Sequence, residues 1–223
     1  MTSNRRAGQA YEQQAEQWYV EPRSTAEQIL DNIDLGGGVV YDPCCGGGNL
    51  LDAAKGRGYR TFGTDIVNRG PAHQFRQADF LRLRDFPFRP PLDVPVSLLF
   101  NPPYGRVGDV ENMAEKFVSH ALKHFADRCF RMVALVPIEF TCGQSRYWQI
   151  YRDNKPSHEL KCSQRPSMPP GHLVAEMGEK AHKGGKSDFC ALVWTGANSE
   201  KCEVVWMRPD NSAGKLDSER RTK

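Results

Sequence analysis

The stretch VVYDPCCGGGNLLDAA, residues 39–54, decides the fold of this chain of 223 residues. A short strand-forming run leads into a glycine-rich turn at residues 43–48, and the apolar residues that follow recur at helical spacing. A strand, a glycine turn and a helix in this order make the first half of a nucleotide-binding α/β unit. We therefore expect a Rossmann-like α/β fold, in which a mostly parallel sheet carries helices on both faces.

A carboxylate follows at the distance that this architecture requires. The second expected strand covers residues 60–66 and carries Asp65, 19 residues after Gly46. At that position an acidic side chain accepts hydrogen bonds from the hydroxyl groups of a ribose. Leu51 stands where a dinucleotide-binding fingerprint has its third glycine, so the sequence disfavours an oxidoreductase.

The second informative stretch is VSLLFNPPYG, residues 96–105, in which an apolar strand ends in Asn101, Pro102, Pro103 and Tyr104. Proline fixes φ near about −65° and has no backbone N–H, so the Pro102 carbonyl is held in one direction with no adjacent donor. The side-chain oxygen of Asn101 adds a second acceptor, and the Tyr104 ring offers a face for a planar base. Two acceptors that bind both hydrogens of one conjugated amino group would make its nitrogen reactive toward an electrophilic carbon.

The rest of the chain supplies further elements of such a sheet. Ser24 and Glu27 have the spacing of a capping box, which predicts a helix from there to about Ile33. Trp18 and Tyr19, just before it, are expected either at the mouth of a ligand site or packed against the sheet. Other helices are expected over residues 111–125 and 144–152, and other strands over residues 74–80, 96–100, 130–137, 158–163, 189–195 and 203–207.

The domain organisation expected is one domain over residues 18–208. A polar lead-in, residues 1–17, precedes it, and a flexible polar tail, residues 209–223, follows it. Residues 164–186 are rich in proline and glycine and are expected to form a long irregular loop. Because loops of this length in compact domains are usually functional, substrate recognition is the role that we expect for it.

Composition narrows the class of protein. No segment reaches the roughly 20 apolar residues of a membrane span, and the N-terminal sequence has no apolar signal-peptide core, so a soluble cytoplasmic protein is expected. The seven cysteines include no C-x-x-C pair, which disfavours both disulfides and a metal site. The net charge is only +3, but positive charge is concentrated in residues 69–89 and 141–186, which suits contacts with phosphate groups.

Together these motifs resemble those of the class I S-adenosylmethionine-dependent methyltransferases, and among them the phage- or prophage-type amino-methyltransferases of DNA adenine. YDPCCGGGNLL at residues 41–51 resembles their first motif, GTDI at 63–66 their second, ADF at 78–80 their third and NPPY at 101–104 their fourth. LVPIEF at 135–140 and RPSMPPG at 165–171 are also similar to stretches of small members of that family.

The resemblance implies a seven-stranded, mostly parallel sheet with one antiparallel strand, and S-adenosyl-L-methionine as the cofactor. Asp42 and the glycine turn would hold its methionine part, Asp65 its ribose, and Asp79 with Phe80 its adenine. The residues expected to contact the cofactor are Tyr19, Asp42, Pro43, Gly46, Gly48, Asp65, Ile66, Asp79 and Phe80, and those expected to be catalytic are Asn101, Pro102, Pro103 and Tyr104. On this basis Asp65→Ala is expected to weaken cofactor binding and to leave the fold intact.

The activity expected is methylation of the exocyclic amino group of adenine in DNA, in a bacterial or phage-infected cell, by a protein that we expect to be a monomer. The same chemistry on RNA adenine or on a protein glutamine amide is an alternative, because Asn-Pro-Pro-Tyr would polarise any conjugated amino group. An alternative of another class is a catalytically silent subunit that binds nucleic acid. Large DNA methyltransferases have a separate recognition domain, and this sequence offers only residues 141–165 and 164–186 for that role.

Overall fold

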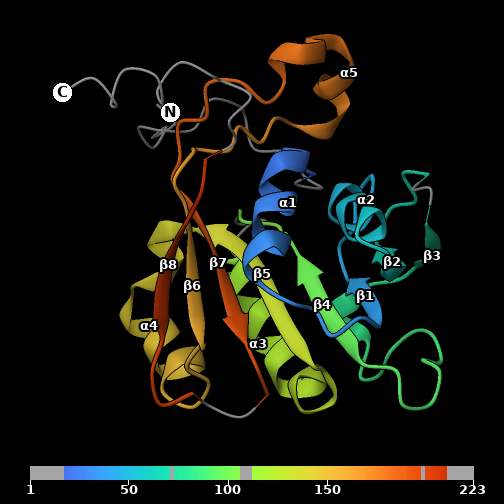
Figure 1. The fold of residues 1–223 in the computed structure, drawn as a ribbon, viewed down its shortest axis with the longest axis vertical. Coiled ribbons are helices and arrows are strands. Elements are labelled where there is room, and N and C mark those ends of the chain that lie inside the picture. Colours follow the sequence, from blue (N-terminus) through green and yellow to red (C-terminus); the bar gives the residue numbers. More distant parts are fainter. Residues whose placement is uncertain (1–17, 71–72, 106–111, 197–198, 210–223) are drawn as a thin grey trace, which may run out of the picture.

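An eight-stranded sheet forms the centre of the computed structural model, which describes residues 18–70, 73–105, 112–196 and 199–209 (Figure 1). The expectations for residues 1–17 and 210–223 lie outside the described residues. The strand order is β3-β2-β1-β4-β5-β7-β6-β8. The strands are β1 (Val39–Asp42), β2 (Arg60–Asp65), β3 (Gln74–Gln77), β4 (Val96–Phe100), β5 (Arg131–Pro137), β6 (His158–Cys162), β7 (Phe189–Trp194) and β8 (Glu203–Met207).

Strand β7 runs antiparallel to both of its neighbours, β5 and β6, and the other paired strands run parallel. This arrangement confirms the predicted Rossmann-like α/β sheet with one antiparallel strand. The family resemblance implied seven strands, whereas the described sheet has eight. The additional strand is β8, which pairs in parallel with the outer side of β6, with Val204 opposite Glu159.

Helices cover both faces of the sheet, as predicted (Figure 1). Helices α1 (Arg23–Asn32) and α2 (Asn49–Gly56) pack on one face, where they share an apolar core with Leu99 of β4. Helix α3 (Met113–Phe125) and α4 (Gln144–Arg146), which continues as a π-helical turn at Tyr147–Tyr151, cover the other face. Leu98 and Phe100 point into this second core, because successive side chains of a strand alternate between its faces.

Helix α1 begins differently from the prediction. Pro22 occupies the N-cap position, and its carbonyl accepts a hydrogen bond from the Thr25 amide at 3.0 Å. Ser24 lies inside the first turn, and Glu27 accepts a hydrogen bond from Arg23 at 2.8 Å instead of capping the helix. The predicted capping box is therefore wrong: the rigid Pro22, with φ of −62°, sets the start of the helix.

The segment 164–186, predicted as an irregular loop, contains short helical turns. They are a 3₁₀ turn at Gly171–Leu173, helix α5 (Val174–Met177) and a 3₁₀ turn at Gly178–Lys180. Figure 1 shows α5 beyond the carboxyl end of β4. The segment is joined to the first described residues, since the Val20 amide donates to the Pro169 carbonyl at 3.0 Å and the Gly171 amide to the Trp18 carbonyl at 2.9 Å.

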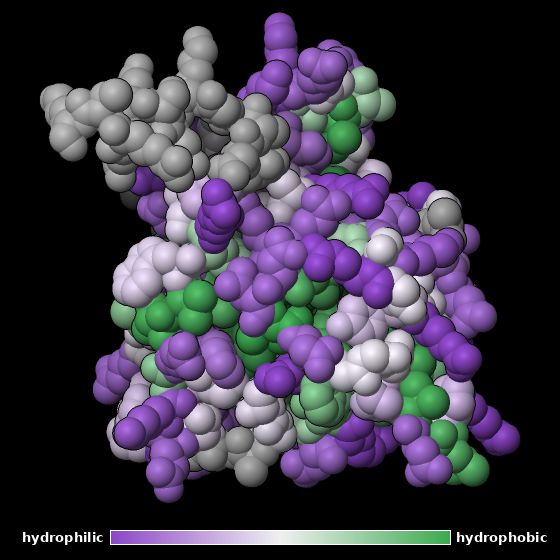
Figure 2. All heavy atoms as spheres, in the orientation of Figure 1, coloured by the Kyte–Doolittle hydropathy of each residue, from purple (hydrophilic) through white to green (hydrophobic). Residues whose placement is uncertain are grey.

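The surface in view is mostly polar, with apolar side chains gathered near its middle (Figure 2). Across the described ranges, no helix has both the length and the apolar composition that crossing a membrane requires.

Candidate active site

The candidate site lies where the order of the strands reverses. The chain passes from β1 outward to β2 and β3 on one side, and β4 lies on the other side of β1. In open parallel sheets, ligands bind at such a reversal, outside the carboxyl ends of the strands. Asp42, Asp65 and Asn101 end or follow β1, β2 and β4, so this topology brings three of the predicted residues to one edge.

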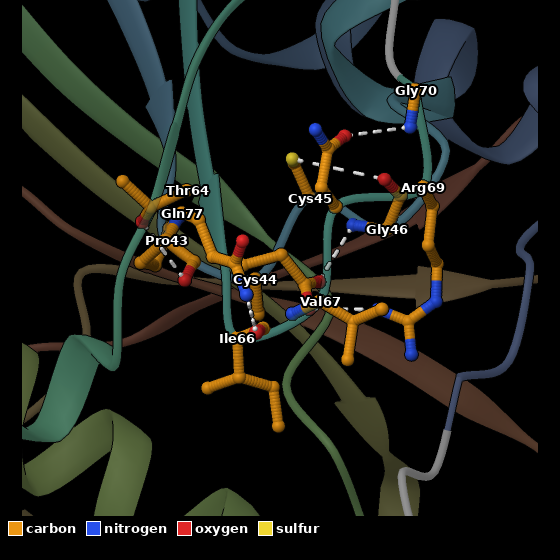
Figure 3. A network of polar contacts seen from close by, with 12 residues as sticks. Pro43, Cys44, Cys45, Gly46, Thr64, Ile66, Val67, Arg69, Gly70 and Gln77 are labelled. Atoms are coloured by element: carbon orange, nitrogen blue, oxygen red, sulfur yellow. Dashed lines mark hydrogen bonds and ion pairs between the residues drawn. The ribbon is translucent and has the colours of Figure 1, made fainter.

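The glycine turn after β1 is held against β2 by internal hydrogen bonds (Figure 3). The Cys45 amide donates to the Thr64 carbonyl at 2.9 Å, and the Thr64 hydroxyl donates to the Pro43 carbonyl at 3.1 Å. Gly46 and Gly48 have φ of 52° and 96°, in the left-handed region that favours glycine. Gly48 is the residue from which α2 begins, so the turn leads the chain directly into that helix.

The Asp65 carboxylate, which was predicted to bind a ribose, accepts hydrogen bonds from the glycine turn and from two residues that follow β2. One oxygen accepts from the Gly46 amide at 2.9 Å. The other accepts from the Val67 amide at 3.0 Å and from the Arg69 guanidinium at 2.7 Å. The side chains of Asp65 and Arg69 are only 10% and 8% exposed, so this is a buried ion pair. A ribose at this position would share or displace these partners.

Two further carboxyl groups are buried beside the turn. Asp42 is 2% exposed and accepts a hydrogen bond from the Cys44 amide at 2.9 Å, and Glu21 is 6% exposed. Burial raises the pKa of Asp42 well above its ordinary value, and the negative charges of Glu21 and Asp65 raise it further. Burial also raises the pKa of Glu21. Such a site favours a positively charged ligand, which would relieve the cost of the buried negative charges.

Asn101 is held by a residue that the sequence reasoning missed. Its Nδ2 donates to Oε2 of Glu21 at 2.8 Å and lies 3.9 Å from the sulfur of Met168. Its Oδ1 accepts a hydrogen bond from the Tyr104 hydroxyl, which also lies 2.9 Å from the Leu135 carbonyl. Glu21 is 80 residues away in the sequence, and its only local signal is its place just before Pro22.

Tyr104 points its hydroxyl into the protein. Burial raises the pKa of Tyr104 well above its ordinary value, so the hydroxyl remains protonated and available as a donor. The ring packs at 5.7 Å from the ring of Phe189 in β7. Pro102 is buried, and Pro103 and Tyr104 are partly exposed. The role of the Tyr104 ring as a stacking surface for a base stays a prediction.

The residues predicted around an adenine lie at the ends of β2 and β3. The strand predicted over residues 74–80 ends at Gln77, and Asp79 instead caps a 3₁₀ turn by accepting from the Leu81 amide at 3.1 Å. Phe80 is 1% exposed and packs in the core, so only its main chain is available to a ligand. Ile66, beside Asp65, is 53% exposed and is the apolar side chain that a planar ring could cover.

A small cavity joins the glycine turn to Asn101. It encloses about 20 Å³, roughly the space of one water molecule. Four of the predicted site residues line this cavity: Tyr19, Asp42, Gly46 and Asn101. The other residues that line it are Trp18, Val20, Glu21, Cys44, Cys45, Gly47 and Asn49. The other predicted residues, Pro43, Gly48, Asp65, Ile66, Asp79, Phe80, Pro102, Pro103 and Tyr104, do not line it.

Trp18 fills the space next to this cavity. A Cβ on Gly46 would lie 2.6 Å from the indole nitrogen, and a Cβ on Gly171 would lie 2.2 Å from an indole carbon. The indole therefore lies between the glycine turn and the segment 164–186, and both contacts require glycine. The guanidinium of Arg69 stacks on the same ring at 4.8 Å. Trp18 and Arg69 together cover the turn from outside.

Comparison with known proteins supports the fold. No protein-family model and no curated protein sequence matches the chain. A modification subunit assigned to a type I restriction enzyme of Vibrio vulnificus YJ016 has a similar structure, with a TM-score of 0.56 and 15% identity over 92% of this chain and 49% of that protein. A protein of Pyrococcus horikoshii assigned as an RNA methyltransferase has a TM-score of 0.56 and 14% identity, over 85% of this chain and 92% of that protein.

The chain thus spans about half the length of the Vibrio subunit and nearly the whole length of the Pyrococcus protein. At these identities the likeness defines the class of fold, a Rossmann-like α/β fold of the kind that these two proteins have. Among the described residues, no three histidine, cysteine, aspartate or glutamate side chains are grouped as metal ligands would be.

Proposed function

We propose that this chain transfers a methyl group from S-adenosyl-L-methionine to the exocyclic amino group of adenine in DNA. The observation that carries the proposal is the cavity shared by the Gly46 turn, the buried carboxyl group of Asp42 and the side chain of Asn101. The turn and the carboxyl group suit a charged nucleoside, and the Asn101 oxygen suits an amino group, so the two partners of a transfer reaction would meet there. The two similar folds belong to a modification subunit assigned to a type I restriction enzyme and to a protein assigned as an RNA methyltransferase.

The chemistry of the described residues fits this cofactor. S-adenosyl-L-methionine would supply an electrophilic methyl group on a positively charged sulfur. The buried carboxyl groups of Glu21 and Asp42 provide negative charge next to the glycine turn. Asp65 stands at the end of β2 for the ribose, and the exposed Ile66 is next to it for the adenine ring. Because the cavity holds only about one water and the Trp18 indole lies against Gly46, we expect Trp18 to move from the turn when the cofactor binds.

The acceptor residues would act on the amino group of the base. Asn101 Oδ1 and the Pro102 carbonyl would each accept one of its hydrogens, and this draws the nitrogen toward a tetrahedral geometry in which its lone pair can attack. The Tyr104 hydroxyl now bonds to Asn101 Oδ1, and it can keep the Leu135 carbonyl as its acceptor when the amino group arrives. The methylated nitrogen would then lose its extra proton to water.

DNA is the substrate that we propose, with residues 164–186 as the recognition segment and the basic residues 69–89 as phosphate contacts. Within residues 69–89, the Arg82 side chain forms an ion pair with Asp79 but is 87% exposed, so it can also contact a nucleic acid. RNA adenine is the second candidate. The observation that favours it is that the similarity covers 92% of the Pyrococcus protein but only 49% of the Vibrio subunit.

Transfer of a radiolabelled methyl group to DNA, RNA and cell protein, measured in parallel, tests the proposal. We expect label in DNA adenine, and a fall in kcat of about 100-fold or more with Asn101→Ala. DNA affinity should fall with salt by roughly 0.9 log units per log unit of salt for each phosphate that is neutralised. Label only in RNA or only in protein would replace DNA as the substrate. Absence of transfer to all three, by a protein that binds nucleic acid, would favour the silent subunit.

A further inference from the structure

We infer that Glu21 is a positioning residue for the proposed methyl transfer, because it orients the Asn101 amide so that its oxygen faces the target amino group. The inference rests on the proposed function and adds to it a residue outside the predicted motifs. An amide oxygen and an amide nitrogen have nearly the same size, so shape alone does not decide which of them faces the base. A flipped amide would present N–H donors to an amino group that is itself a donor.

The contacts of the Asn101 nitrogen settle its direction. Nδ2 lies 2.8 Å from Oε2 of Glu21, and an ionised carboxylate can only accept hydrogen bonds. The sulfur of Met168, a weak acceptor, lies 3.9 Å from the same nitrogen. Both acceptors lie around Nδ2, which leaves Oδ1 on the side of Tyr104.

Tyr104 by itself would permit either direction of the amide. Its hydroxyl can donate to Asn101, or it can donate to the Leu135 carbonyl and accept from Asn101. Glu21 has no such freedom while it is ionised. The carboxylate is therefore the group that discriminates between the two orientations.

The position of Glu21 is itself built into the fold. Its main-chain carbonyl accepts a hydrogen bond from the Asn49 side chain, at the start of α2, at 3.1 Å. The residue before it, Val20, bonds to Pro169, and the residue after it, Pro22, is the N-cap of α1. Glu21 is only 6% exposed as a residue, and it reaches Asn101 from a fixed backbone.

Protonation of Glu21 would change the constraint that this residue places on the Asn101 amide. A protonated Glu21 has one O–H donor beside its remaining acceptor oxygen, so it could bond to either end of the Asn101 amide and would no longer discriminate between the two orientations. The titratable groups that face Glu21 are Asp42 from β1, Cys44 from the glycine turn, Tyr104 from the end of β4 and His182 from the segment 164–186. Because Asp42 can also titrate, the pH profile has to be compared with that of Glu21→Gln, which keeps Asp42.

The decisive experiment exchanges donor and acceptor between the two residues. Asn101→Asp places two carboxyl groups in contact, and we expect kcat to fall by about 100-fold or more, as when one preorganised partner of a transition state is lost. Adding Glu21→Gln should recover about tenfold or more of that loss, because in the E21Q/N101D protein the glutamine amide can donate to one oxygen of the new carboxylate while its other oxygen accepts from the base. Glu27→Gln, in the exposed ion pair of α1, is the matched control and should leave kcat unchanged.

Single substitutions separate positioning from a structural role. Glu21→Ala should lower kcat with little change in the KM for DNA, and Glu21→Gln should retain more activity and lose the fall in kcat at low pH. Failure of Glu21→Gln to improve Asn101→Asp, or an unchanged kcat in a folded Glu21→Ala protein, would overturn the inference. A merely structural role predicts additive effects of the two substitutions and no recovery.

The inference can fail separately from the proposed function. If the wild-type chain transfers no methyl group to DNA, RNA or protein, the proposed function fails. The side-chain amide of Asn101 is then observed by nitrogen-15 NMR, with Asn101→Asp used to assign its signals. We expect those signals to shift in Glu21→Ala and to move less in Glu21→Gln. Unchanged signals in Glu21→Ala would show that Glu21 does not orient the amide.

Discussion

Replacement of Asp65 by alanine tests whether this carboxylate holds the glycine turn in place. From the sequence we predicted that the change weakens cofactor binding and leaves the fold intact. In the structure the carboxylate accepts from the main-chain amides of Gly46 and Val67 and from Arg69. The substitution therefore removes three internal hydrogen bonds along with the contact predicted to a ribose, and we now expect a loss of stability as well.

The size of this loss follows from the burial of the partners. The Gly46 amide is buried, and a buried donor that loses its acceptor costs about 1–3 kcal/mol. Removal of one partner of a buried ion pair costs about 3–5 kcal/mol. We take the low end of this range, because Arg69 also stacks on Trp18 and keeps that contact when Asp65 is removed. We expect the free energy of unfolding to fall by about 4 kcal/mol in total, the low end of the sum of these two costs. For a chain of this length the Tm would then fall by roughly 8–16 °C.

Urea unfolding followed by circular dichroism, together with a thermal melt, measures this change. The matched control is Asp79→Ala. Asp79 forms an ion pair with Arg82, in which the two side chains are 41% and 87% exposed. Asp79 also caps only one 3₁₀ turn. We expect the control to cost about 1 kcal/mol or less, because exposed ion pairs contribute little. Both variants should keep the wild-type denaturant slope if unfolding remains two-state.

The same unfolding midpoint for Asp65→Ala and wild type would refute the reasoning. The carboxylate would then not anchor the turn, and a loss of cofactor affinity in this variant could be assigned to the ribose alone. If the expected loss of stability is found, cofactor affinity has to be compared in Asp65→Asn, which can still accept hydrogen bonds through its side-chain oxygen.

Three further predictions concern the Trp18 indole and the buried carboxyl groups beside the glycine turn. Cofactor binding should change tryptophan fluorescence, because we expect the Trp18 indole to leave the turn. Trp18→Phe should abolish this change, whereas the control Trp148→Phe, which removes a 54% exposed ring, should keep it. A fluorescence change retained in Trp18→Phe would show that the indole stays in place. Gly171→Ala should displace the same indole, since its Cβ would lie 2.2 Å from an indole carbon, and acrylamide should then quench Trp18 more strongly than in wild type; equal quenching would contradict the packing. Burial raises the folded-state pKa of Glu21 and Asp42, so the stability that they contribute is complete below their ordinary pKa values and is lost as pH rises through the raised values. Urea melts between about pH 5 and 8 should show Glu21→Gln gaining stability relative to wild type as pH rises, and parallel curves would contradict this.

The fold was largely predictable because its signals are local. Residues 39–54 contain a strand, a glycine turn and a helix in direct succession, and each is determined by periodicity and by turn residues within a few positions. The strand-like runs at residues 189–195 and 203–207 likewise became β7 and β8. The start of α1 was misread because Ser24 matches a capping pattern, whereas Pro22 already fixes the backbone ahead of it.

The sequence alone determined which residues stand at the ends of the strands, because parallel strands joined by helices bring their carboxyl ends to one edge. It could not show what those residues contact. Glu21 reaches Asn101 across 80 residues, and Trp18 fits between Gly46 and Gly171 only because the segment 164–186 pairs with residues 18–20. Such contacts depend on packing between distant segments, and no periodicity records them. The tertiary structure therefore decided that the Asp65 carboxylate binds its own turn, that Phe80 belongs to the core, and that an indole covers the site where we propose that the cofactor binds.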